Sequence, residues 1–146
     1  MIRKLTADDR ELYISMAEEF YHSDAVLSPV PRSYIEKTVD EALHSDAYAE
    51  LFLFEHEGEI AGYGLTAKTF SQEAGGFVWW IEEIYIREPF RSKGLGREFF
   101  AYIEDHKGEN VTRLRLEVEE DNTRAVALYK KLGYKVLDYV QMVKEN

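Results

Sequence analysis

The stretch IYIREPFRSKGLGR, residues 84–97, decides the fold because it carries a strand through a glycine-bearing turn into a helix. Ile84 and Ile86 end the apolar strand, and Gly94 and Gly96 stand where the helix begins. The first amides of a helix lack an intrahelical acceptor and carry partial positive charge, so they can hold an anion. Glycine adds no side chain that would block a phosphate or forbid positive φ. The turn therefore predicts an anion-binding loop.

Three basic side chains surround this turn, Arg91, Lys93 and Arg97. The chain as a whole has 18 basic and 28 acidic residues, which gives a formal net charge of −10. A local excess of positive charge in an acidic chain favours an anionic ligand. The pattern Arg-x-x-Gly-x-Gly is weak by itself, because an ordinary helix-starting turn with solvated bases also fits it.

Two better-known phosphate loops do not fit the turn. A P-loop needs Gly-Lys followed by Ser or Thr, whereas the order here is Lys93, Gly94, Leu95. A dinucleotide-binding turn needs a small residue three positions after its second glycine, and that position holds Phe99. Both classes of site are excluded.

Hydrophobic periodicity around the turn predicts an α/β chain in the order β-α-α-β-β-β-α-β-α-β. Gly62 and Gly64, inside a predicted strand, indicate a bulge or a close packing approach. No linker or repeat interrupts the pattern, so we expect a single domain over residues 1–146. The expected elements are a strand at 2–5, a helix that follows a capping box at Thr6 and Asp9, a helix at 32–44, strands at 51–54, 60–70 and 77–86, a helix at 94–107, a strand at 112–118, a helix at 122–132 and a strand at 134–143.

Composition excludes several classes of protein. The 146 residues include no cysteine, which excludes disulfides, thiolate zinc sites and a cysteine nucleophile. The acidic balance makes nucleic acid and anionic membranes poor partners. The longest strongly apolar run, residues 77–81, is far shorter than the ~20 residues of a membrane span, and the first residues lack the pattern of a signal peptide. We therefore expect a soluble, cytoplasmic protein.

A second segment, NTRAVALYKKLGY at residues 122–134, completes a recognisable pair of motifs. Together with the turn at 84–97 and the segment EGEIAGY at 57–63, it resembles the Gcn5-related N-acetyltransferase (GNAT) family. The turn resembles that family's acyl-CoA pyrophosphate loop, and the second segment resembles its Asn-x-x-Ala-x-x-Leu-Tyr motif. Two departures concern only the shape of the loop: Ser92 stands where glycine is frequent, and Pro89 lies two residues before Arg91 rather than three.

The resemblance implies the GNAT acyl-CoA N-acyltransferase fold, an α/β (α+β) domain whose mixed central sheet has splayed central strands. It implies acetyl-CoA-dependent transfer of an acetyl group directly to a primary amine, with a small molecule as the expected acceptor and no metal. Two alternatives stay open, a non-catalytic acyl-CoA or ligand sensor on the same fold and an acetyltransferase of protein N-termini or lysines. A homodimer is common in the family.

The resemblance also assigns cofactor-binding positions. The strand before the turn would pair its backbone with the pantetheine arm, with the Ile86 N–H on the thioester carbonyl. Asn122 fits either a helix cap or a cofactor contact. The implied cofactor-binding set is Ile84, Tyr85, Ile86, Arg91, Ser92, Lys93, Gly94, Leu95, Gly96, Arg97, Asn122, Ala125 and Tyr129.

Catalytic roles follow from the same resemblance. Tyr129 matches the family's general acid, although a packing role is the alternative for one of ten tyrosines. Glu82 and Glu83 precede an expected bulge and are the candidates for removing the ammonium proton through a water. Adjacent strand residues face opposite sides, so one of the two is expected to face the cleft, and its position favours Glu82. The alternative is that both are solvated charges.

Substrate-contacting positions are the least specific. The family forms its substrate wall between the first two helices, where surface packing is an equal alternative for each residue. The candidates are Tyr21, His22, Asp24, Tyr34 and Trp80.

Overall fold

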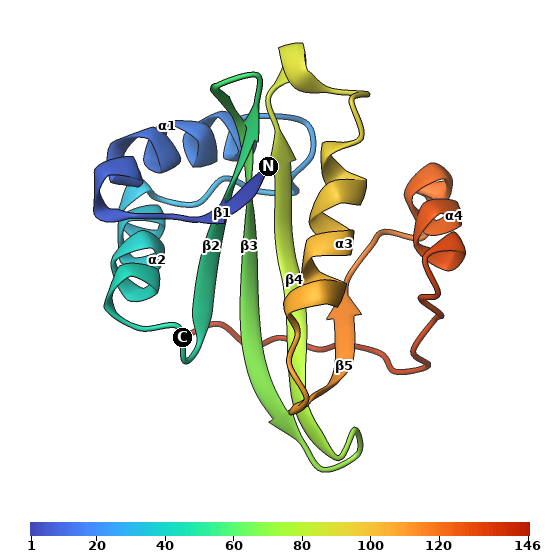
Figure 1. Ribbon diagram of the computed structural model, residues 1–146. Coiled ribbons are helices and arrows are strands. Elements are labelled where there is room, and N and C mark those ends of the chain that lie inside the picture. Colours follow the sequence, from blue (N-terminus) through green and yellow to red (C-terminus); the bar gives the residue numbers. More distant parts are fainter. The chain divides into compact units, whose positions relative to one another are not determined.

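The computed structural model describes residues 1–146 and divides into two compact units, residues 1–116 and residues 117–146 (Figure 1). Most predicted elements are confirmed within a few residues. The single domain over 1–146 stays a prediction. The first unit contains β1 (Ile2–Lys4), the 3₁₀ turn η1 (Ala7–Asp9), α1 (Arg10–Tyr21), α2 (Arg32–His44), β2 (Ala49–His56), β3 (Glu59–Ser71), β4 (Gly76–Ile86), η2 (Glu88–Phe90), α3 (Leu95–His106) and β5 (Val111–Leu116), and the second contains α4 (Thr123–Lys131).

The sheet has five strands in the order β1-β2-β3-β4-β5. Neighbouring strands are antiparallel except for β4 and β5, which are parallel and joined through α3. This confirms the mixed sheet. The pairing of β4 with β5 ends at Ile81 and Leu116, whereas β4 itself continues to Ile86. The last five residues of β4 therefore have a strand partner only on the β3 side.

Helices cover both faces of the sheet, and alternation along β2 shows how (Figure 1). Leu51 and Leu53 belong to the buried cluster formed with α1 and α2. Phe52 and Phe54 point the other way and contact the ring of Phe99 on α3, with centroids 5.7 and 5.0 Å apart. Successive strand side chains face opposite sides, so one continuous apolar run supplies both cores.

Two glycines of β3 permit close packing, as predicted. A Cβ on Gly62 would lie 2.1 Å from the carbonyl oxygen of Tyr85 on β4, and a Cβ on Gly64 would lie 2.5 Å from the ring of Phe99. Both positions exclude any side chain. Gly62 thus allows the backbone at the end of β4 to contact β3, and Gly64 allows the Phe99 ring of α3 to pack directly on the sheet.

The start of α1 confirms the predicted capping box. Asp9 accepts hydrogen bonds from the backbone N–H and the hydroxyl of Thr6 at 2.8 and 2.9 Å. Arg3 of β1 also donates to Asp9, at 2.8 and 2.9 Å. These donors hold the pKa of the Asp9 carboxyl well below its usual range. The first helix is thereby tied to the edge strand of the sheet.

The structure differs from the prediction after α4. No strand forms over residues 134–143, and the residues that follow Gly133 have neither helix nor strand. The apolar residues there suit a strand, but a strand exists only where its backbone groups pair with a neighbour. No helix in the chain is both long enough and apolar enough to cross a membrane.

Gly64→Ala tests the packing of α3 on the sheet. We expect this variant to lower the free energy of unfolding by about 1–3 kcal/mol, because the added methyl group forces the Phe99 ring to move. Urea unfolding measures the change. Gly96→Ala is the matched control, since a Cβ there would meet only the Ile86 Cδ1 at 3.9 Å. Equal stability of the two variants would contradict the packing role of Gly64.

Candidate functional site

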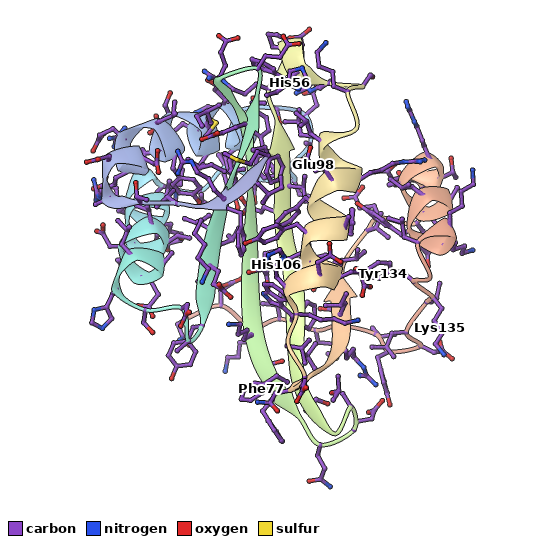
Figure 2. The ribbon with its side chains drawn as sticks, in the orientation of Figure 1. His56, Phe77, Glu98, His106, Tyr134 and Lys135 are labelled. Carbon is purple, nitrogen blue, oxygen red and sulfur yellow. The ribbon has the colours of Figure 1, made fainter.

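The loop between β4 and α3 is fixed at its strand end. Arg87 donates its backbone N–H to the carbonyl of Ala61 at 2.8 Å, and the short turn η2 follows with Pro89 near its start. Phe90 of η2 makes an edge contact with His56 at the end of β2, with centroids 6.2 Å apart (Figure 2). The loop is thus anchored to both β3 and β2.

Two residues of the loop have positive φ, Ser92 at 62° and Gly94 at 81°. The left-handed region costs little for glycine and is unfavourable for serine. Glycine would suit position 92 better, so the predicted departure from the family pattern coincides with a strained backbone position. Such strain persists where the surrounding structure holds the loop in one shape.

The first turn of α3 presents free backbone donors, as predicted. The first helical bond runs from the Glu98 N–H to the Gly94 carbonyl at 3.0 Å, so the N–H groups of Leu95, Gly96 and Arg97 have no intrahelical acceptor. Leu95 is buried and anchors the turn. Gly96 has neither positive φ nor a close neighbour, and packing within the chain therefore does not require a glycine there. The open space beside these amides suits a ligand.

The three cations of the loop have different environments. Arg91 donates its Nε–H to the carbonyl of Ile86 at 2.9 Å and so folds back on the end of β4. Lys93 and Arg97 are exposed and make no ion pair with a carboxylate. Uncompensated positive charge beside free amides is the arrangement that binds phosphate groups.

The end of β4 presents backbone groups on its open edge. Arg87 directs its N–H toward β3, and alternate strand residues point the same way, so Tyr85 and Glu83 also face β3. The N–H groups of Ile84 and Ile86 therefore point toward the edge where β5 has ended. The carbonyl of Ile86 already accepts from Arg91, and its N–H is the donor left at that position.

The bulge in β4 lies at Glu82 itself rather than after Glu83. Leu65 pairs with Glu83 and Thr66 pairs with Ile81, which leaves Glu82 as the extra residue. Glu82 is exposed and Glu83 is half-buried. A bulge redirects a side chain at the point where regular pairing is interrupted.

Glu83 accepts hydrogen bonds from two phenols. Tyr21, the last residue of α1, donates to Oε2, and Tyr63 of β3 donates to Oε1 at 2.8 Å. Burial, followed by the influence of Glu83, raises the pKa of each of these phenols above its ordinary value. Both tyrosines therefore stay protonated and act as donors to the carboxylate at neutral pH.

The other predicted substrate residues make no hydrogen bond with Glu83. His22 bonds through its Nδ1 to the backbone oxygen of Glu18 at 2.7 Å. Asp24 lies in the exposed loop after α1. Tyr34 of α2 is 56% exposed. Trp80 is half-buried beneath Arg115, whose guanidinium lies 4.2 Å from a ring centroid.

Sequence reasoning missed two residues of this region, Glu19 and Tyr63. The Glu19 carboxylate accepts from the Tyr85 hydroxyl at 2.9 Å and contacts an Arg87 Nη2 at 3.3 Å. Its partners lie more than 60 positions away along the chain, and no short motif connects them. Only the packing of α1 on the sheet identifies these contacts.

The second unit contains the remaining predicted residues. Asn122 accepts the Ala125 N–H at 3.3 Å and so caps α4, which confirms the capping alternative. Tyr129 lies one turn after Ala125, is half-buried, and contacts the ring of Tyr134 with centroids 6.2 Å apart (Figure 2). Burial raises the pKa of the Tyr129 phenol, which keeps its proton available for donation.

Comparison with known proteins gives one consistent result. A family model described as the acetyltransferase (GNAT) family matches residues 11–134. The spermine/spermidine N(1)-acetyltransferase of Bacillus subtilis (strain 168) is 30% identical over 110 residues, which cover 70% of this chain and 71% of that protein.

Solved structures give the same fold at low sequence identity. The crystal structure of a possible acetyltransferase from Clostridium difficile 630 matches with a TM-score of 0.86 at 22% identity and covers 100% of this chain and 97% of that one. AAC(6')-Iy, in complex with the bisubstrate analogue CoA-S-monomethyl-acetylneamine, matches with a TM-score of 0.80 at 15% identity, with the same coverage.

Proposed function

Because the chain belongs to the acetyltransferase (GNAT) family and is an N-acetyltransferase, we propose that it transfers the acetyl group of acetyl-CoA directly to a primary amine of a small molecule. The observation that carries this proposal is the juxtaposition of two kinds of free backbone donor. The first turn of α3 offers unpaired amides, and the end of β4 offers an unpaired edge directly before it. A phosphate-bearing thioester needs both.

The loop residues hold the pyrophosphate of acetyl-CoA. The N–H groups of Leu95, Gly96 and Arg97 donate to phosphate oxygens, and Lys93 and Arg97 supply positive charge. The open space at Gly96 fits this role, because a side chain there would tilt toward the start of the helix. The bisubstrate complex of the structural neighbour AAC(6')-Iy supports a CoA derivative as the ligand.

Backbone groups of β4 orient the acyl arm. Ile84 pairs with the pantetheine, and the Ile86 N–H donates to the thioester carbonyl, where negative charge increases during transfer. A preorganised donor aimed at such an oxygen contributes strongly to rate, and losing one costs about 10²–10³-fold in kcat. Acetyl-CoA supplies the activated acetyl group itself.

The acceptor amine must lose its proton before it attacks. In our proposal Glu82 takes that proton through a water, and its exposure at the bulge supports this role. Glu83 is the alternative, with its carboxylate held by Tyr21 and Tyr63. Tyr21 of the predicted substrate wall thus contacts one of the two candidate bases.

Tyr129 donates a proton to the departing thiolate. Burial raises the pKa of the Tyr129 phenol, so the phenol is protonated at neutral pH, as a general acid must be. Ala125 lies one turn earlier on the same side of α4.

The acceptor is a small cationic amine. The net charge of −10 disfavours anionic acceptors, and the named relative from Bacillus subtilis acts on spermine and spermidine. A panel of polyamines, aminoglycosides and amino acids, assayed with acetyl-CoA by thiol release, tests the proposal. We expect turnover with at least one small amine.

Peptide acceptors in the same assay, together with a titration of acetyl-CoA binding, separate the alternatives. Acetyl-CoA binding without turnover would favour the sensor, and turnover only with peptides would favour a protein acetyltransferase. No binding of acetyl-CoA at micromolar concentration would overturn the entire assignment.

Gly96→Ala tests the phosphate-binding turn. We expect the dissociation constant for acetyl-CoA to rise at least about tenfold, because the new methyl group occupies the space beside the donor amides. Calorimetric titration measures it. The free energy of unfolding should stay equal or rise, since alanine suits a helix better than glycine. Unchanged affinity would place the phosphates elsewhere.

Glu82→Gln and Glu83→Gln form a matched pair at the bulge. We expect Glu82→Gln to lower kcat/KM by about 10²–10⁴-fold with the best amine, the contribution typical of a general base, and Glu83→Gln to lower it less. Steady-state assays across pH measure both variants. The reverse order would assign the proton transfer to Glu83, and unchanged rates in both would remove the pair from the mechanism.

Tyr129→Phe tests the acid. We expect kcat to fall by about 10²-fold while acetyl-CoA affinity is retained, because only the phenolic proton is lost. Turnover and binding are measured separately on the same preparation. Tyr48→Phe, at a tyrosine that is 70% exposed, is the control. If Tyr129→Phe turned over like the control, Tyr129 would be a packing residue.

A further inference from the structure

Glu19 of α1 bridges two residues that flank Ile86. One carboxylate oxygen accepts from the Tyr85 hydroxyl at 2.9 Å, and the other lies 3.3 Å from an Arg87 Nη2. Tyr85 lies on β4 and Arg87 follows the strand directly in an extended conformation, so their side chains leave the chain on the same side. Ile86 points to the opposite face, where its Cδ1 approaches Gly96. A single carboxylate therefore connects both neighbours of the proposed thioester donor.

The same short segment is also tied to β3 and to the loop that follows it. The carbonyl of Tyr85 would lie 2.1 Å from a Cβ on Gly62, so β3 is in close contact beneath it. The Arg87 N–H bonds to Ala61, and the Ile86 carbonyl accepts from Arg91. Each tie restricts the peptide planes around Ile86. The Glu19 bridge adds a further tie between this segment and α1.

Stability alone gives little reason for this bridge. The side chains of Glu19 and Arg87 are 39% and 33% exposed, and ion pairs at such positions contribute at most about 1 kcal/mol. The buried Tyr85 hydroxyl needs a partner, but a single acceptor would satisfy it. The additional contact with Arg87 restrains the segment and adds little energy.

We propose that Glu19 is a positioning residue, whose carboxylate fixes residues 85–87 so that the Ile86 N–H points at the thioester carbonyl. The inference rests on the proposed function, in which that N–H stabilises the charge that develops on the oxygen. A displacement of about 1 Å at such a donor costs up to about 10²-fold in rate. Glu19 itself touches no substrate.

Glu19→Gln keeps the length of the side chain but removes its charge and one of its two acceptor oxygens. The amide nitrogen can only donate, so it either faces the Arg87 guanidinium or reverses the hydrogen bond with the Tyr85 hydroxyl, and the charge that holds Arg87 is gone in both cases. We expect kcat to fall about 10- to 100-fold, with the dissociation constant of CoA within about twofold of the wild-type value, because CoA lacks the acyl carbonyl. Calorimetry and steady-state assays measure the two quantities.

Glu18→Gln is the matched control on the same helix. Glu18 pairs with Arg32 of α2 at 3.2 Å, so the variant loses an equivalent ion pair without touching β4. Its kcat should equal that of the wild type. Tyr85→Phe keeps the buried ring and removes only the hydroxyl, and the double variant with Glu19→Gln should be no slower than Glu19→Gln alone. Equal losses of kcat in Glu18→Gln and Glu19→Gln would overturn the proposal.

A readout without turnover separates this inference from the proposed function. In the ligand-free protein, the backbone order parameter of the Ile86 amide should be about 0.85 and should fall in Glu19→Gln, but not in Glu18→Gln. An unchanged order parameter in Glu19→Gln would contradict the positioning role even if the wild-type protein acetylated no amine. Two results together would contradict both the proposed function and this inference: no binding of acetyl-CoA by the wild-type protein, and an unchanged order parameter at Ile86 in Glu19→Gln.

Discussion

The close approach of β3 and β4 at Gly62 is the constraint on which the rest of the site depends. No side chain fits between Gly62 and the carbonyl of Tyr85, so the two backbones meet directly at the end of β4. This contact fixes which backbone groups of Tyr85 and Ile86 face β3 and which face the open edge. The loop that leads into α3 follows from that direction, because it begins at Arg87, directly after the strand ends.

Local signals were sufficient for most of the fold. The capping box at Thr6, the apolar spacing of the helices and the glycine turn each act within a few residues, and each is confirmed. The hairpins and the α3 crossover extend this to the order from β2 to β5, since strands that follow one another in the chain are usually neighbours. The final predicted strand had an apolar pattern but no partner, because a pattern specifies a face and not a neighbour.

The candidate site shows a sharper boundary between what sequence can and cannot predict. The loop from Arg91 to Arg97 and the cap at Asn122 were predictable because their chemistry is contiguous. The bridge at Glu19 and the phenol of Tyr63 were not, since their partners are distant in sequence and meet through packing. The net charge of −10 does not show where charge lies along the chain, and the three loop cations are found only from their positions around the turn.

The end of α1 and the end of β4 are connected by two tyrosine–glutamate pairs of opposite direction. Tyr21 donates from the helix to Glu83, and Tyr85 donates from the strand to Glu19. Two residues advance about 3 Å along a helix and about 6.8 Å along an antiparallel strand, so only long side chains can match both pairs.

Because one tyrosine donates from the helix and the other from the strand, the two pairs also favour one alignment of α1 along β4 over shifted alignments. A slip of α1 by two residues toward the start of β4 would set Glu19 against Glu83 and bring two carboxylates together. Repulsion between like charges opposes that slip. The two pairs therefore fix the register between α1 and β4, so charge as well as packing determines where the first helix ends along the strand.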